Sequence, residues 1–312
     1  MSYTKRIATF PSSDGKNTVH AEIYIPDGEV RGVVLLSHGM IDYVGRYTAL
    51  AEYLTSQGFV FAGNDHLGHG ETAATPDDYG YFAERDGYKL VINDLYKMNR
   101  LVRAEFPSVP AFLLGHSMGS FLARLYTVAY PDSIDGVIIH GTGGKNPLLP
   151  FGKAVIALTR AFRGARHRSK LVKALAFGSY NDHFDKSEGP DAWLTRDIAA
   201  VASRPTDPHT SYIFTAAGYA DLFTMIGECN GKAHFASFPK DMPTLVISGE
   251  EDPVGNYGKG VRFVYDSLVD AGVRSVSLKT YEGARHELFN ETNKDEVFAD
   301  ILAWLTEAMA KK

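Results

Sequence analysis

Short, wholly apolar segments alternate with longer helix-period segments along most of this chain. Gly32–Ser37 (GVVLLS) is one such apolar segment, and a helix-period segment at 47–57 follows it and stops at Gly58. A strand covered on both faces is apolar throughout, and repeated strand–helix–strand units imply parallel strands with helices on both faces of the sheet. The alternation therefore predicts an α/β fold with a mostly parallel central sheet.

The remaining pattern divides the chain into three parts. An opening hairpin is expected at 6–10 and 18–25, followed by strands at 59–64, 111–115 and 136–140 and helices at 86–105 and 118–130. After an interruption the pattern resumes with a strand at 244–248, a helix at 257–271, a strand at 275–281 and a helix at 295–309. The interruption is helical without an apolar strand. We therefore predict a core of residues 1–142 and 239–312, with a helical cap at 143–238 inserted after the sixth strand.

Composition narrows the class of protein. The chain has 312 residues, 45% apolar and 22% charged, which is typical of a globular protein with a sizeable core. A net charge of −5 and the lack of a basic run interleaved with aromatics argue against nucleic acid as a partner. One cysteine, Cys229, and no apolar stretch of membrane-spanning length favour a cytoplasmic location. No oligomeric state is indicated.

The segment Gly115-His116-Ser117-Met118-Gly119 joins a predicted strand to a predicted helix. In this G-x-S-x-G pattern, small residues at both ends allow a tight turn that projects the serine hydroxyl. The turn also places Ser117 at a helix N-terminus, which favours developing negative charge. A glycine-flanked turn without function is the alternative, but the strand–helix context favours Ser117 as a nucleophile.

A serine hydroxyl needs a base and an orienting carboxylate to become nucleophilic. His286 directly follows the last predicted strand, and Asp252 directly follows the strand before it. Loops at the carboxyl ends of parallel strands share one edge of the sheet, so we expect both residues to meet Ser117. Locally hydrogen-bonded loop roles are the alternative for each residue, and Glu250 and Glu251 are alternative carboxylates.

The oxyanion of an acyl-transfer intermediate needs preorganised donors. We expect the backbone N–H of Met118 to be one donor and that of Met40 to be the other, because Gly39 lets the backbone approach the substrate there. His116 and His38 are expected to be scaffold residues.

His66 and His69 raise the alternative of a metal site. The stretch around them has no third ligand at suitable spacing, so we expect these imidazoles and Asp65 to hydrogen-bond a glycine-rich loop beneath the site. We expect neither a metal nor a cofactor.

Five stretches carry a resemblance to a known family: Leu36-Ser37-His38-Gly39-Met40, Asp65-His66-Leu67-Gly68-His69-Gly70, Gly115-His116-Ser117-Met118-Gly119, Gly249-Glu250-Glu251-Asp252-Pro253-Val254 and Gly283-Ala284-Arg285-His286-Glu287. Together they resemble the monoacylglycerol lipase and lysophospholipase-like α/β-hydrolases (Hydrolase_4, serine aminopeptidase S33) of bacterial type. The resemblance implies a helical lid and hydrolysis of acyl esters of glycerol or lysophospholipid. Leu67 and Thr72 depart from the residues frequent at those positions, which weakens any specific substrate assignment.

The substrate-binding residues are less constrained. Gly39, His116, Phe214, Leu222 and Val254 are our candidates, and Tyr219, Phe223 and Met225 could extend an acyl channel. Core packing explains the apolar members of this set equally well.

Residues 151–180 contain seven Lys/Arg and no Asp/Glu, so the rest of the chain carries −12. Beside apolar residues such as Phe151 and Phe162, this basic helical segment could contact anionic lipid transiently, or it could be a solvated helix face.

The chemistry therefore favours a serine hydrolase of carboxylic esters that acts on a small-molecule ester or lipid. Three rivals stay open: a peptidase or amidase, a cofactor-free perhydrolase, and a non-catalytic ligand receptor on the same fold.

Overall fold

One sheet organises residues 2–310, the part of the chain that the computed structural model describes. Within those residues eight strands lie in the order β1-β2-β4-β3-β5-β6-β7-β8. The first two are antiparallel to their neighbours, and the other pairs are parallel. The strands are β1 Tyr3–Pro11, β2 Thr18–Pro26, β3 Gly32–Ser37, β4 Phe59–Asn64, β5 Ala111–His116, β6 Gly136–His140, β7 Thr244–Gly249 and β8 Val276–Tyr281.

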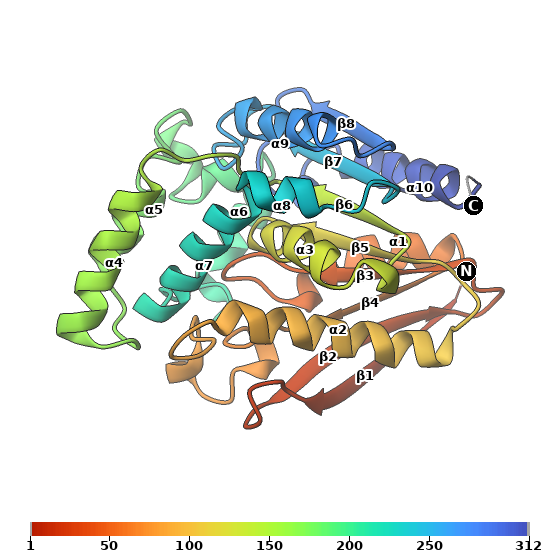
Figure 1. The fold of residues 1–312 in the computed structure, drawn as a ribbon, viewed down its shortest axis with the longest axis horizontal. Coiled ribbons are helices and arrows are strands. Elements are labelled where there is room, and N and C mark those ends of the chain that lie inside the picture. The colour runs from red at the N-terminus through yellow and green to blue at the C-terminus, as the bar shows by residue number, and fades with distance from the viewer. Residues whose placement is uncertain (1, 311–312) are drawn as a thin grey trace.

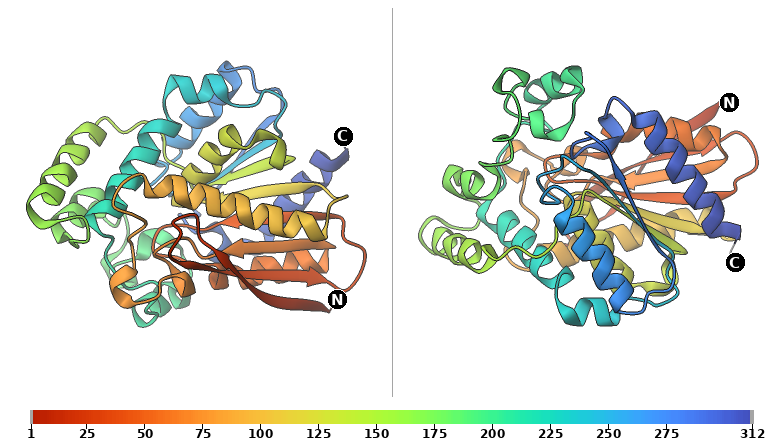
Figure 2. Two further views of the ribbon diagram at one scale, coloured as in Figure 1. Left: turned by 60° about the horizontal axis from the view of Figure 1, so that its bottom comes forward. Right: turned by 90° about the horizontal axis from the view of Figure 1, so that it is seen from above.

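Helices cover both faces of this sheet and enclose two apolar cores. Helices α1 (Thr48–Ser56) and α10 (Lys294–Ala310) pack on one face. Helices α2 (Gly87–Glu105), α3 (Met118–Ala129) and α9 (Lys259–Asp270) pack on the other, and Figure 2 shows α9 and α10 on opposite sides of the strands. The apolar strands are buried because each core takes alternate side chains from them.

Five further helices lie between β6 and β7. They are α4 Leu149–Arg163, α5 Lys170–Phe177, α6 Ile198–Ser203, α7 Ala216–Cys229 and α8 Lys232–Ser237. Four of them, α4 to α7, gather at one end of the sheet, away from both chain termini, whereas α8 lies beside α3 (Figure 1). We call residues 143–238 the insert. Short 3₁₀ turns complete the chain: η1 Val44–Tyr47, η2 Gly70–Thr72, η3 Pro76–Asp78, η4 Pro131–Ser133, η5 Lys186–Glu188, η6 Ala192–Leu194, η7 Arg204–Thr206 and η8 Leu288–Asn290.

Helix α7 attaches the insert to the start of α2. The hydroxyl of Tyr88 donates to both carboxylate oxygens of Glu228, at 2.9 Å each. Asp221 is buried against Gly87, where an added Cβ would lie 2.7 Å from its Oδ2. Polar and charged groups therefore fix the position of α7 on the core.

The mostly parallel α/β fold predicted above is confirmed, although some boundaries differ. The helix expected from residue 257 begins at Lys259, because Asn256 and Tyr257 have φ values of 48° and 53° and cannot continue a right-handed helix. Among residues 2–310, no helix is both long and apolar enough to cross a bilayer.

Candidate active site

Ser117 lies in the sharp turn between β5 and α3. Its φ of 53° and ψ of −119° fall outside the conformations that L-residues ordinarily adopt. A Cβ added at Gly119 would overlap the carbonyl oxygen of Ser37, so only glycine permits this approach of helix to strand. The Ser117 N–H donates to the His140 carbonyl at 2.9 Å, and the side chain is partly exposed. The elbow expected from the sequence therefore forms.

His286 and Asp252 form a buried pair on the loops after β8 and β7. Nδ1 of His286 lies 2.9 Å from Oδ2 of Asp252, and their exposed fractions are 2% and 0%. The N–H of Val254 donates to Oδ1 at 2.8 Å, and the Ser248 hydroxyl donates to Oδ2 at 3.2 Å. This pairing engages Nδ1 and leaves Nε2 of His286 for another partner.

The imidazole of His286 packs beside the serine elbow. Its ring centroid lies 4.8 Å from that of His116, the residue before Ser117. A Cβ added at Gly141 would lie 3.0 Å from Cε1 of His286 and 3.5 Å from Nδ1 of His116. His286 and Asp252 therefore lie at the carboxyl edge of the sheet, beside the elbow that carries Ser117.

The loop after β3 packs directly against the elbow. A Cβ added at Gly39 would lie 3.3 Å from Cβ of Ser117 and 3.1 Å from Cδ2 of His116. Met40 follows Gly39 in this loop. Met118 is the first residue of α3, so the N–H of Met118 has no acceptor within that helix. Both amides therefore belong to segments in contact with Ser117.

Two buried histidines, His116 and His140, lie next to the proposed triad. Nδ1 of His116 lies 3.0 Å from Nδ1 of His140. Burial lowers the pKa of His140 to about 3 and holds the pKa of His116 well below its usual value. Both imidazoles are therefore neutral near pH 7, and one ring nitrogen can donate to the other.

The stretch 65–70 has the scaffold role expected from the sequence. The His66 N–H donates to Nε2 of His38 at 3.0 Å, and the Asp65 carboxylate accepts from the Val44 and Glu71 amides at 2.8 Å each. Across the described chain, no group of three or more His, Cys, Asp or Glu side chains is arranged to hold a metal ion.

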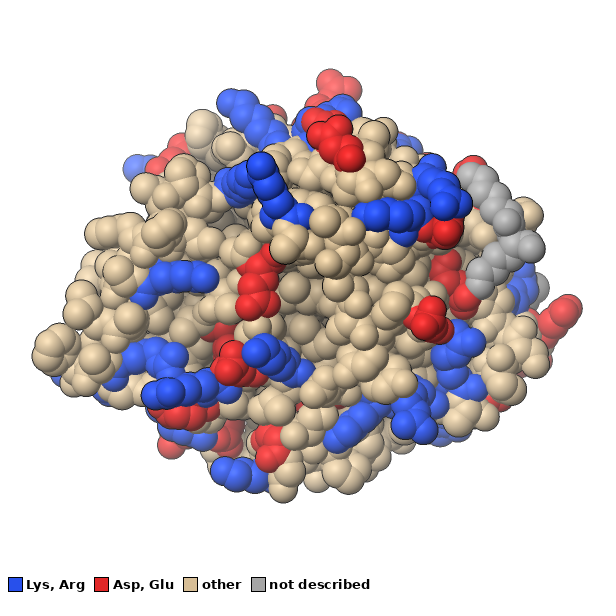
Figure 3. Space-filling view, viewed as in Figure 1, with Lys and Arg blue, Asp and Glu red and all other residues tan. Residues whose placement is uncertain are grey.

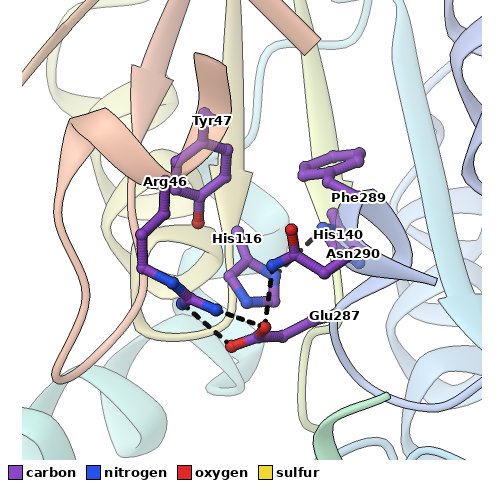
Figure 4. Close-up of a pocket in the computed structure, with 7 residues that line it drawn as sticks. All are labelled: Arg46, Tyr47, His116, His140, Glu287, Phe289 and Asn290. Atoms are coloured by element: carbon purple, nitrogen blue, oxygen red, sulfur yellow. Dashed lines mark hydrogen bonds and ion pairs between the residues drawn. The ribbon is translucent and has the colours of Figure 1, made fainter. Parts of the chain in front are cut away.

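A charged cluster beside the site was missed by sequence analysis. Figure 4 shows Arg46 and Asn290 converging on the carboxylate of Glu287, around a cavity of about 10 Å³ that His116 and His140 also line. Arg204 of the insert donates to the same carboxylate at 3.1 Å, and Arg46 also donates to Asp42 at 2.9 Å. The available signal was the position of Glu287 directly after His286.

The remaining substrate candidates lie in varied surroundings. Phe214 is fully buried, with its ring 5.3 Å from His69, and Leu222 belongs to the same apolar core. Val254 is half-buried beside Asp252, to which it donates its N–H. Their roles toward a substrate stay predictions.

A serine at such an elbow, on a sheet of this order, defines the α/β-hydrolase class. The family model described as Hydrolase_4, serine aminopeptidase S33, matches residues 28–293, and the chain belongs to that family. The resemblance found in the sequence is confirmed.

Relatives with assigned names agree with this membership. A monoacylglycerol lipase from Mycolicibacterium smegmatis is 26% identical over 313 residues, covering 98% of each chain. Human monoglyceride lipase is 25% identical over 296 residues, covering 91% of this chain and 86% of the human one.

Solved structures are also similar. A thermostable carboxyl esterase from Bacillus coagulans, in complex with glycerol, has a TM-score of 0.91 and 28% identity, covering 98% of this chain and 99% of the esterase. A soluble variant of Saccharomyces cerevisiae monoglyceride lipase, in complex with a substrate analog, has a TM-score of 0.76 and 23% identity, covering 99% and 96%, which supports the fold alone. The sequence-based prediction of a carboxylic-ester hydrolase agrees with these relatives.

Proposed function

We propose that this chain hydrolyses carboxylic esters through Ser117, His286 and Asp252, and that its substrates are monoacylglycerols or related lipid esters. The observation that carries the proposal is the position of the strained, partly exposed Ser117 beside the buried His286–Asp252 pair. The substrate class rests on the relatives named as monoacylglycerol lipases and on the carboxyl esterase complex with glycerol.

In the proposed reaction, Oγ of Ser117 attacks the ester carbonyl while Nε2 of His286 takes its proton. Asp252 holds the tautomer and orientation of the imidazole from Nδ1. The N–H groups of Met40 and Met118 stabilise the oxyanion, and His286 then protonates the leaving alcohol. Water, deprotonated by the same imidazole, releases the carboxylic acid and regenerates Ser117.

Replacing the nucleophile tests this assignment directly. Ser117→Ala should lower kcat by roughly 10⁶-fold with the fold intact, because the whole triad depends on that hydroxyl. A fluorophosphonate probe should label the wild type and Ser120→Ala, whose hydroxyl only donates to the Ser117 carbonyl, but not Ser117→Ala. Undiminished hydrolysis of a p-nitrophenyl ester by Ser117→Ala would exclude the proposal.

The ester class is tested by a substrate panel. Turnover of monoacylglycerols, lysophospholipids and short p-nitrophenyl esters should be highest for the monoacylglycerols. Equal or higher kcat/KM for the short p-nitrophenyl esters would overturn the lipid assignment while preserving the nucleophile, and higher kcat/KM for lysophospholipids would replace monoacylglycerols as the lipid class.

A second candidate is peptidase or amidase activity, which the family description as a serine aminopeptidase favours. The same nucleophile and oxyanion donors can attack an amide carbonyl. Comparing an aminoacyl-anilide with the matching ester separates the two, and higher kcat/KM for the anilide would favour the peptidase. Halogenation in peroxide tests a perhydrolase, and failure of the fluorophosphonate probe would indicate a receptor.

An exposed apolar surface on the insert supports the proposal of a lipid substrate. Phe151, Leu158 and Phe162 project from one side of α4 with exposed fractions of 62%, 60% and 82%. Figure 3 shows few charged side chains over this end of the molecule. An apolar stripe directed at solvent is typical of a helix that lies in the interface of a bilayer or micelle.

The seven Lys and Arg residues of 151–180 divide into two groups. Arg160, Arg166 and Arg168 donate to backbone carbonyls within 76–84, so they join the insert to the core. The rest are exposed, and they are Lys153, Arg163, Lys170 and Lys173. We propose that this second group, with the apolar stripe of α4, makes transient contact with anionic lipid.

A further inference from the structure

A segment of the insert lies along the loop that carries His286. We call residues 188–196 the strap. The His286 and Glu287 amides donate to the Trp193 and Leu194 carbonyls at 3.4 Å and 2.6 Å. Side chains join the same two segments: Arg285 to the Ala192 carbonyl at 2.7 Å, Thr195 to the Asn290 carbonyl at 2.9 Å and Arg196 to Glu291 at 2.8 Å. The strap is therefore fixed on this loop.

The strap brings the indole of Trp193 onto the imidazole of His286. The two ring centroids lie 5.1 Å apart with an interplanar angle of 34°. The Tyr180 ring lies 5.1 Å from the indole in an edge-to-face arrangement, and the backbone N–H of Trp193 donates to Oδ1 of Asn181 at 3.0 Å. The imidazole therefore contacts both a ring of the insert, Trp193, and a ring of the elbow, His116, whose centroid is 4.8 Å away.

We propose that Trp193 is a positioning residue for His286, with a preference for the charged form of its imidazole. The inference rests on the proposed function, in which His286 takes the proton of Ser117. An indole within about 6 Å attracts a cation through its ring quadrupole, and tryptophan does so best. That attraction is greatest when the imidazole is protonated, so it stabilises the transition state more than the ground state.

The other titratable groups around the imidazole come from several elements. Asp252, after β7, is the counter-charge. His116 and His140, at the ends of β5 and β6, are neutral because burial lowers their pKa values. Glu287 of the same loop is paired with Arg46 of η1. Tyr180 lies near Asp252, and burial raises its pKa well above neutral, so its hydroxyl carries no charge there. Trp193 thus adds an attraction for positive charge without adding a negative one.

Two substitutions of Trp193 distinguish the effect of its aromatic face from the effect of its size. Trp193→Leu keeps an apolar side chain over the site but removes the aromatic face, whereas Trp193→Phe keeps a face. We expect Trp193→Leu to lower kcat about ten-fold, with KM within two-fold and the acidic midpoint of the kcat/KM–pH profile moved to lower pH. Trp193→Phe should restore most of kcat. Equal effects of Leu and Phe, or an effect on KM alone, would overturn the proposal.

Fluorescence provides a readout independent of turnover. The chain contains two tryptophans, and Trp304 packs against Phe112 on the far side of the core. Trp304→Phe is therefore the matched control for kinetics and leaves Trp193 as the single indole. A protonated imidazole in contact with an indole quenches the fluorescence of the indole. The emission of Trp193 should therefore decrease as the pH is lowered through the acidic midpoint of activity. His286→Gln should abolish that decrease.

The two proposals fail differently. Adding Ser117→Ala to Trp304→Phe should abolish hydrolysis but preserve the fluorescence titration. If the fluorescence titration persists and the Ser117→Ala variant retains activity, the assignment of Ser117 as nucleophile is excluded, but the role of Trp193 is not. Emission that does not respond to pH in an active Trp304→Phe enzyme would exclude the role of Trp193 alone.

Discussion

Arg46 and Glu287 form a two-pronged ion pair between residues 241 positions apart. Nη1 of Arg46 lies 3.0 Å from Oε1 of Glu287, and Nη2 lies 2.6 Å from Oε2. Arg46 lies in η1, at the end of the loop after β3, and Glu287 directly follows His286. The pair therefore joins the segment that holds Gly39 and Met40 to the segment that holds the proposed base.

Glu287→Gln should destabilise the protein by about 3–5 kcal/mol at pH 7, because it removes the buried carboxylate that pairs with both half-buried Arg46 and buried Arg204 and leaves Asp42 as the remaining partner of Arg46. Burial alone would raise the pKa of Glu287, but Arg46 and Arg204 lower it to about 2. This stabilisation is complete above the unfolded-state pKa of about 4.3 and is lost as pH falls toward 2. Urea unfolding should show a larger difference between wild type and variant at pH 7 than at pH 3.

A matched control is Glu296→Gln, which removes an exposed partner of Lys279. Its effect should be below about 0.5 kcal/mol at either pH. A Glu287→Gln effect of the same small size would contradict the structural role of the pair.

Asp252→Asn should lower kcat by about 10⁴-fold with little change in fold, because the amide no longer fixes the tautomer of His286. Glu250→Gln and Glu251→Gln replace exposed carboxylates beside it and should retain near wild-type kcat. Steady-state hydrolysis of a p-nitrophenyl ester measures all three. A large loss in either glutamate variant, with Asp252→Asn active, would reassign the orienting carboxylate.

Asp221 should make the protein less stable in mildly alkaline solution. Burial raises its pKa to about 7, and the amides of Gly87 and Tyr88 only partly oppose that shift. A raised carboxyl pKa contributes stability below the unfolded-state value, and this contribution is lost as pH rises through about 7. Asp221→Asn should therefore gain on the order of 2–4 kcal/mol relative to wild type at pH 8 but little at pH 4.

Chemical unfolding at the two pH values checks this expectation. Asp270→Asn, an exposed carboxylate at the end of α9, is the control and should leave the pH dependence unchanged. An Asp221→Asn protein that is no more stable than wild type at pH 8 would show that Asp221 is ionised without cost in the fold.

Phe162→Ser should weaken binding to anionic vesicles about ten-fold, because an exposed phenylalanine contributes about 1.5–3 kcal/mol when it enters an apolar phase. Val269→Ser is the control: it removes an exposed apolar side chain on α9, outside the α4 stripe, and should have no effect on vesicle binding. Lys170→Glu with Lys173→Glu should reduce binding to anionic vesicles but not to neutral ones. Vesicle co-sedimentation at two salt concentrations measures each variant, and unchanged binding by Phe162→Ser would exclude the α4 stripe.

The parallel core was predictable because each strand carries its own signal. Val33 to Leu36 are apolar and fully buried, Ser117 directly follows the equally buried strand β5, and His286 lies on the loop after the edge strand β8. In a parallel sheet, residues that follow the carboxyl ends of strands lie at the same edge, so their position after a strand is enough to predict that they share it. The geometry of the His286–Asp252 pair therefore agrees with what the order of elements implied.

Contacts between the insert and the core could not be predicted in the same way. Trp193 and Arg204 are separated from any strand by loops, and their partners depend on how the insert folds back. The basic segment shows a similar limit: its charge was visible in the sequence, but the use of Arg168 to bind backbone carbonyls at Tyr79 and Ile213 was not. Such contacts follow from tertiary packing rather than from local periodicity.

The backbone pairing of Trp193 and Leu194 with His286 and Glu287 has a consequence for enzyme engineering. Exchanging the entire insert for that of a homologue, in order to alter chain-length preference, would also replace the support of the proposed general base, His286. A graft limited to α4 and α5 would spare that support, so chimeras with junctions before residue 180 should retain turnover where full exchanges lose it.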